Sequence, residues 1–91
     1  MINKTIIVTG ATDGIGLEAA TKIAALGNRV GLVGRNPEKG AKAIERIASL
    51  TRNDKLDFFQ ADLSLVSEIH KLSHEIKSKY SKLNVLLNNA G

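Results

Sequence analysis

The sequence of 91 residues has no cysteine, no tryptophan, a single proline and no long hydrophobic run. Without cysteine there is neither a disulfide framework nor a thiolate metal site. No apolar stretch approaches the roughly 20 residues that a membrane-spanning helix needs. The first residues lead directly into an apolar run and leave no room for a signal peptide, so we expect one soluble, cytoplasmic domain over residues 1–91.

Aromatic residues and clustered charges are scarce as well. Thirteen Lys and Arg residues against nine Asp and Glu residues give a formal net charge of +4, but the basic residues are scattered from Lys4 to Lys82. Surfaces that bind nucleic acid usually combine clustered basic residues with aromatic side chains for stacking. We therefore expect no nucleic-acid partner, and we assign most of the lysines to solvated helix faces.

What the sequence does contain is a glycine-rich turn. Gly10, Gly14 and Gly16 stand between the apolar run of residues 6–8, which predicts a buried strand, and a helical pattern from Leu17. Glycine lets a ligand approach the backbone closely, and the following helix directs free N–H groups at the loop. The turn therefore predicts a diphosphate site. The alternative is a simple connection, because the spacing is neither the usual dinucleotide fingerprint nor a P-loop.

Strand and helix patterns alternate along the whole chain. The expected strands are residues 5–9, 29–34, 56–61 and 83–87. Helices are expected from near Gly14, after the N-cap Asn36 and after the N-cap Ser64. Such alternation predicts parallel strands with right-handed crossovers. We therefore predict a Rossmann-like α/β fold in three layers with strand order 3-2-1-4, and a ligand crevice at the carboxyl ends of the first and fourth strands.

Each expected helix carries an apolar stripe that predicts its buried face. The first stripe is Ile15, Ala19, Ile23 and Leu26. The second is Ala41, Ile44, Ile47 and Ala48. The third is Leu65, Ile69, Leu72, Ile76 and Tyr80.

Three motifs resemble those of the short-chain dehydrogenase/reductase family. Residues 9–16 match its Thr-Gly-x3-Gly-x-Gly motif, residues 62–63 match its acidic–apolar pair, and residues 88–91 match its Asn-Asn-Ala-Gly motif. The resemblance covers all 91 residues and is nearest to retinol- and steroid-type reductases. It implies that the parent protein transfers hydride between a nicotinamide dinucleotide and a carbonyl compound or alcohol.

The resemblance also implies which residues bind the dinucleotide. The glycine loop would hold the pyrophosphate, Asp62 and Leu63 would contact the adenine, and residues 89–91 would lie near the nicotinamide-side ribose, while Asn88 would steady the sheet. The residues so implied are Gly10, Thr12, Asp13, Gly14, Ile15, Gly16, Asp62, Leu63, Asn89, Ala90 and Gly91. Considered without the family, Asp62 is simply an acidic residue at a helix N-terminus.

The end of the second expected strand indicates which cofactor is used. An NAD site needs a carboxylate there, to accept a hydrogen bond from the ribose 2′-hydroxyl. Residues 34–36 contain no acid, but Arg35 can pair with a 2′-phosphate through its planar fork of donors. We therefore predict NADP in preference to NAD. The alternative is that Arg35 is an ordinary surface arginine.

The family's proton-transfer residues are not found in the sequence. They are a tyrosine with a lysine four residues later, and a serine. The only tyrosine is Tyr80, and the residue four positions later is Asn84. We therefore predict no catalytic residue here. Two hypotheses follow: the chain is the cofactor-binding portion of an NADP-dependent oxidoreductase, or it is a nucleotide-binding module without activity.

Two further features carry weaker predictions. The apolar strand at residues 83–87 would form an open sheet edge, which predicts self-association. His70 and His74 stand one helical turn apart, a spacing that can bind a metal. They lie opposite the apolar stripe, so we interpret them as solvated and expect no metal site.

Overall fold

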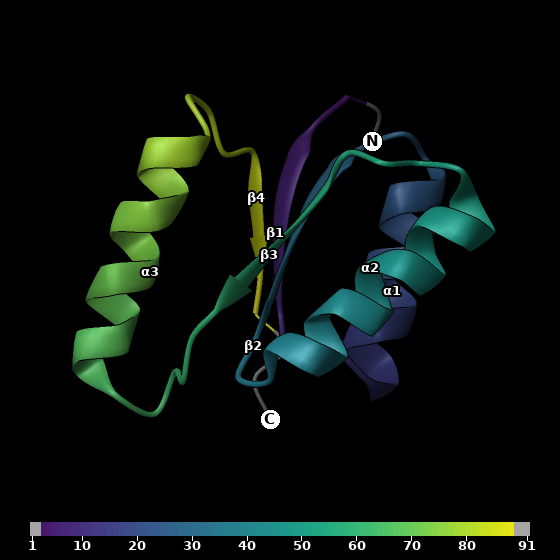
Figure 1. Ribbon diagram of the computed structural model, residues 1–91. Coiled ribbons are helices and arrows are strands. Elements are labelled where there is room, and N and C mark those ends of the chain that lie inside the picture. Colours follow the sequence, from purple (N-terminus) through teal and green to yellow (C-terminus); the bar gives the residue numbers. More distant parts are fainter. Residues whose placement is uncertain (1–2, 89–91) are drawn as a thin grey trace.

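The computed structural model describes residues 3–88, in which a parallel four-stranded sheet separates two layers of helices (Figure 1). The strands are β1 (Thr5–Thr9), β2 (Arg29–Gly34), β3 (Leu56–Gln60) and β4 (Val85–Leu87). The helices are α1 (Gly14–Ala25), α2 (Pro37–Thr51) and α3 (Val66–Lys79). Helices α1 and α2 lie on one face and α3 on the other. The strand order is β3-β2-β1-β4, which confirms the predicted 3-2-1-4 order.

The core has two apolar layers, because β1 and β2 are covered on both faces. Successive strand residues point to opposite faces of a sheet. Thus Ile6 and Val8 join the layer under α1 and α2, whereas Ile7 joins the layer under α3. This explains why the strands are continuous apolar runs and do not alternate between apolar and polar residues.

The buried face of α1 differs from the prediction. The helix buries Gly16, Ala20 and Ala24, while Ile15 is 78% exposed and Leu26 is 54% exposed. The reason is that a helix approaches a sheet most closely through its smallest side chains, whereas side-chain hydrophobicity favours Ile15 and Leu26. The predicted face is therefore wrong at both of its ends.

The other two stripes are partly correct. Helix α2 buries Ile47 as predicted, but it also buries Ala43 and leaves Ala41 exposed. In α3, Leu72 is buried and packs with Ile76, while the other end of that stripe is exposed. The exposed residues at that end are Leu65 and Ile69.

The two predicted N-caps have different outcomes. The side chain of Asn36 accepts hydrogen bonds from the backbone N–H groups of Glu38 (2.9 Å) and Lys39 (3.2 Å), so this cap is confirmed. Ser64 is not the N-cap, because Leu65 occupies that position, and the backbone N–H and hydroxyl of Ser64 instead both donate to the Asp62 carboxylate. This local turn delays the start of α3 to Val66.

Candidate functional site

Two segments far apart in the sequence meet at the carboxyl ends of β1 and β4. Val8 pairs with Leu87 in the parallel register, so both strands end at the same edge of the sheet. One residue further along each strand, the Thr9 hydroxyl donates a hydrogen bond to Asn88 Oδ1 over 3.0 Å. Asn88 thus joins the end of β4 to the start of the glycine loop. The predicted residues Asn89, Ala90 and Gly91 lie outside the described residues.

The glycine loop needs glycine for its backbone conformation. Gly10 has φ +61° and Gly14 has φ +56°, in the left-handed region that side chains disfavour. A side chain at Gly14 would meet open space, so its conformation and not crowding requires glycine there. The backbone N–H of Ala11 donates to Val33 O over 3.3 Å and ties the loop to β2. The backbone conformation of these glycines and the bond to β2 therefore fix the shape of the loop.

The start of α1 provides the hydrogen-bond donors of the site. The first amide groups of any α-helix have no partner inside that helix. Asp13 occupies the N-cap position, but its side chain makes no capping hydrogen bond. Ile15 follows and is largely exposed, while Gly16 is buried against the sheet. The exposed amide end of α1 can therefore receive an anion.

The end of β2 lies beside the loop and carries an exposed arginine. Gly34 permits this approach, because a Cβ atom there would lie 2.8 Å from Thr12 Cγ2. Arg35 follows, exposed to solvent, and Asn36 then caps α2. The structure thus places Thr12 against Gly34, the residue before Arg35, at this edge of the sheet.

Asp62 and Leu63 follow β3 at the same edge. The Ala61 N–H donates to Gly34 O over 3.0 Å, which places the ends of β3 and β2 side by side. Hydrogen bonds from Ser64 hold the pKa of the Asp62 carboxyl below its ordinary value, and the charge of Arg35 lowers it further. Leu63 is half-buried and packs against the layer under α3.

A lysine that the sequence analysis did not identify also reaches the loop. Lys39 Nζ lies 3.1 Å from the Asp13 carboxylate, and both side chains are exposed. Lys39 stands in the first turn of α2, three residues after the cap Asn36. Its position near the start of the helix that follows Arg35 indicates from the sequence that Lys39 lies close to this site. Its contact with Asp13, however, depends on how α2 packs beside α1.

Tyr80 lies away from this edge and acts in the core. Its ring packs edge-to-face against Phe59 at 5.9 Å, and its hydroxyl donates to Asp57. Burial raises the pKa of the Tyr80 phenol, and the hydrogen bond to the Asp57 carboxylate raises it further. This arrangement keeps the phenol protonated and fits the prediction that Tyr80 is a core residue.

Stability at alkaline pH should therefore depend on Tyr80. A phenol with a raised pKa in the folded state stays protonated above pH 10, the ordinary value, where the unfolded chain ionises. The contribution is complete below pH 10 and is lost as the pH rises further, by up to about 1.4 kcal/mol per pH unit. Urea unfolding of the wild type and of Tyr80→Phe as a function of pH measures the difference. A wild-type profile parallel to that of Tyr80→Phe would contradict this prediction.

Neither a metal cluster nor a membrane span is found among residues 3–88. Both histidines, His70 and His74, are exposed on α3, and no group of three or more His, Cys, Asp or Glu residues in this range could hold a metal ion. No helix within the same range is long and apolar enough to cross a membrane.

Comparison with known proteins agrees with this geometry. A family model described as short chain dehydrogenase matches residues 4–91. Polyprenol dehydrogenase of Homo sapiens is 39% identical over 89 residues, which cover 98% of this chain and 27% of that protein. The 3beta-hydroxysteroid dehydrogenase of Mediterraneibacter gnavus is 41% identical over 88 residues, which cover 97% and 31%. The chain thus spans about three-tenths of the length of these relatives.

A solved structure has the same fold. The Pseudomonas aeruginosa RhlG/NADP active-site complex has a TM-score of 0.90 and 27% identity, and the match covers 100% of this chain and 36% of that one. The nucleotide in this neighbour is NADP.

Proposed function

Because this chain belongs to the short-chain dehydrogenase family, we propose that it is the NADP(H)-binding portion of an oxidoreductase that acts on a carbonyl compound or an alcohol. The observation that carries the proposal is the meeting of the glycine loop, the end of β4 and Arg35 at one edge of the sheet. In open α/β sheets, ligands bind where the strand order reverses, and β1 and β4 form that point here.

The pyrophosphate would lie on the loop between β1 and α1. Gly10 and Gly14 give the loop its open conformation, and Gly16 lets α1 pack closely on the sheet. The amide groups around Ile15 and the positive end of the helix dipole would bind the phosphate oxygens. Thr12 would border the same site from the loop. No basic side chain is needed for this part of the ligand.

The 2′-phosphate would lie beside Arg35, with Lys39 as a second cation. A carboxylate in the loop would repel phosphate, and Asp13 is the acid of the glycine loop. The ion pair of Asp13 with Lys39, at 3.1 Å, reduces this repulsion. Residues 34–36, at the end of β2, include no acid that could accept a hydrogen bond from a 2′-hydroxyl, which favours NADP over NAD.

The remaining contacts complete the proposal. Asp62 would accept a hydrogen bond from the adenine amino group, since its carboxyl pKa is lowered by Ser64 and the carboxylate is ionised at neutral pH. Leu63 would contact the same ring. Residues 89–91 would contact the nicotinamide-side ribose.

The chemistry needs a proton donor that the described residues do not place at this edge. When bound, NADPH supplies the hydride but not the proton. The only tyrosine of the sequence is hydrogen-bonded to Asp57 in the layer under α3 and does not reach this edge. Turnover of NADPH with a carbonyl substrate by this chain would therefore contradict a purely binding role. Since two relatives are named for a polyprenol and a 3beta-hydroxysteroid, the proposed substrate class is a lipophilic alcohol or its carbonyl form.

Calorimetric titration of the chain with 2′,5′-ADP and with 5′-AMP tests the proposed cofactor. Binding of both, with 2′,5′-ADP tighter, is the expected result. Equal affinities would contradict the preference for NADP, and no binding of either would contradict a nucleotide site in this chain.

We also propose a cytoplasmic location, which imaging of a fluorescently tagged chain tests.

A further inference from the structure

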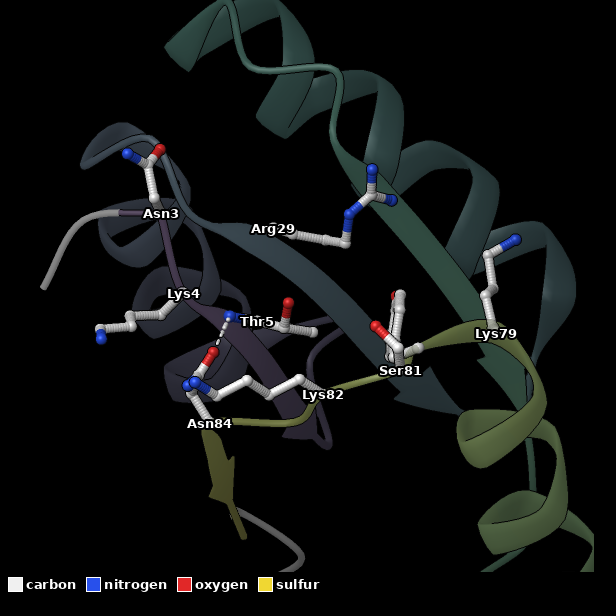
Figure 2. A pocket seen from close by; sticks show the side chains of 9 residues that line it. Asn3, Lys4, Thr5, Arg29, Lys79, Ser81, Lys82 and Asn84 are labelled. Atoms are coloured by element: carbon white, nitrogen blue, oxygen red, sulfur yellow. Dashed lines mark hydrogen bonds between the residues drawn. The ribbon is translucent and has the colours of Figure 1, made fainter.

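A second polar cavity lies at the opposite edge of the sheet, where the strands begin. Its volume is about 450 Å³, and Figure 2 shows side chains around it from the start of β1, the start of β2 and the segment that joins α3 to β4. Thr5 and Thr9 are the two ends of β1, so about 13 Å of strand separates this cavity from the glycine loop. It is therefore a separate site from the proposed dinucleotide site.

The lining of this cavity is strongly basic. Lys4, Arg29, Lys79 and Lys82 all line it, and no acidic residue does. Four of the thirteen Lys and Arg residues of the chain thus gather at this one cavity. Three of the four lie outside helices, so Lys4 and Lys82 are exceptions to the expectation that most lysines lie on solvated helix faces.

One nearby carboxylate neutralises only part of this charge. Asp57 accepts from Arg29 over 3.2 Å and lies 3.3 Å from Lys79 Nζ. Burial raises the pKa of the Asp57 carboxyl, but hydrogen bonds from Tyr80, Lys79 and Arg29 outweigh this, so its pKa lies below its ordinary value and it stays ionised. Among residues 3–88, no ion pair joins Lys4 or Lys82 to a carboxylate.

Neutral hydrogen-bond donors complete the lining. Asn84 Oδ1 accepts from the Thr5 N–H over 2.9 Å (Figure 2), and this bond does not use the amide NH₂ group of Asn84, which is a donor. Ser81 adds a hydroxyl from the same segment. Cations combined with neutral donors are the usual surroundings of a bound phosphate.

We propose that this cavity binds the phosphate group of a small phosphorylated molecule. A phosphate monoester carries roughly 1.5 to 2 negative charges, which matches the charge of four cations and one nearby carboxylate better than a second carboxylate does. The volume lies within the range of small-molecule sites, about 300–1,000 Å³. The only aromatic ring on the lining, Tyr80, already packs against Phe59, so no stacking platform for nucleic-acid bases is offered.

Titration of the ¹⁵N-labelled chain with pyrophosphate, followed by NMR, tests the proposal. We expect shifts at the amides of Thr5, Ser81 and Asn84. At this cavity, as measured from the shifts of these three amides, the double variant Lys4→Gln/Lys82→Gln should bind pyrophosphate at least about tenfold more weakly, because it removes two cations that no ion pair holds among residues 3–88. The spectrum of each variant also shows directly whether it is folded.

Two control variants and a sedimentation experiment with lipid vesicles accompany this titration. The double variant Lys42→Gln/Lys71→Gln removes the same charge from exposed positions on α2 and α3, and should leave the affinity within about twofold. Arg35→Ala should also leave pyrophosphate shifts at this edge unchanged. No binding, equal losses in both double variants, or loss with Arg35→Ala alone would overturn the proposal. So would sedimentation with phosphatidylglycerol vesicles without binding of soluble pyrophosphate, which would assign the surface to lipid headgroups.

Discussion

Replacing Arg35 with alanine should weaken binding of 2′,5′-ADP roughly 10- to 150-fold, because charge-assisted hydrogen bonds contribute about 1.5–3 kcal/mol. Binding of 5′-AMP should change by less than about twofold, since it carries no 2′-phosphate. The guanidinium is exposed and follows β2 directly, so no core contact is lost with it. Calorimetric titration of the wild type and the variant with both nucleotides gives the change in affinity for each nucleotide.

The control for this experiment is Arg46→Ala. Arg46 is an exposed arginine on α2, well beyond the first turn that borders the glycine loop. Its removal changes the net charge equally and should leave both affinities nearly unchanged. An equal loss of affinity for both nucleotides in Arg35→Ala would show that Arg35 acts only by general electrostatic attraction, and would contradict a 2′-phosphate site.

The strands and their order could be predicted because their signals are local. Each strand is a short apolar run between turn residues, and parallel connection by helices leaves few possible orders. The buried face of α1 could not be predicted in the same way. A hydrophobic stripe favours Ile15 and Leu26, but the close approach of α1 to the sheet selects Gly16, Ala20 and Ala24. Which of the two faces is buried depends on packing distance, and the sequence does not state it.

For the candidate site, too, local features could be predicted from the sequence and contacts between distant elements could not. The glycine loop is contiguous in the sequence, and its conformation follows from the residues themselves. The pairing of Lys39 with Asp13 joins two helices and becomes visible only when both are placed. Ser64 shows a third case, in which a local turn at Asp62 moves the start of α3 to Val66, beyond the serine expected to cap it.

The basic cavity could have been inferred from topology. Lys4 and Arg29 directly precede or begin a strand, and Lys82 precedes the fourth. In a parallel sheet all strands begin at the same edge, so residues at these positions gather even when they are far apart in the sequence. Basic residues counted along the chain look scattered, whereas the same residues counted by strand position form one group.

Truncation of Ile7 to alanine should cost about 2–5 kcal/mol of unfolding free energy, because a buried isoleucine leaves a cavity when it is shortened. Ile7 is fully buried in the layer under α3. Its register partner Leu86 provides the matched control, since parallel pairing places both side chains on the same face of adjacent strands. Leu86 is 59% exposed, so Leu86→Ala in a monomer should cost less than about 1 kcal/mol. Urea unfolding of both variants measures the two costs.

The same pair of variants tests the proposed self-association through β4. Leu86 lines an apolar groove of about 630 Å³ together with Ile69 and Leu83. If a second copy pairs with this edge, the unfolding free energy of the wild type rises with protein concentration, and Leu86→Ala removes that rise while Ile7→Ala keeps it. Sedimentation equilibrium should show the matching loss of dimer. A wild type that stays monomeric, with concentration-independent unfolding, would show that the open edge at β4 does not pair with itself.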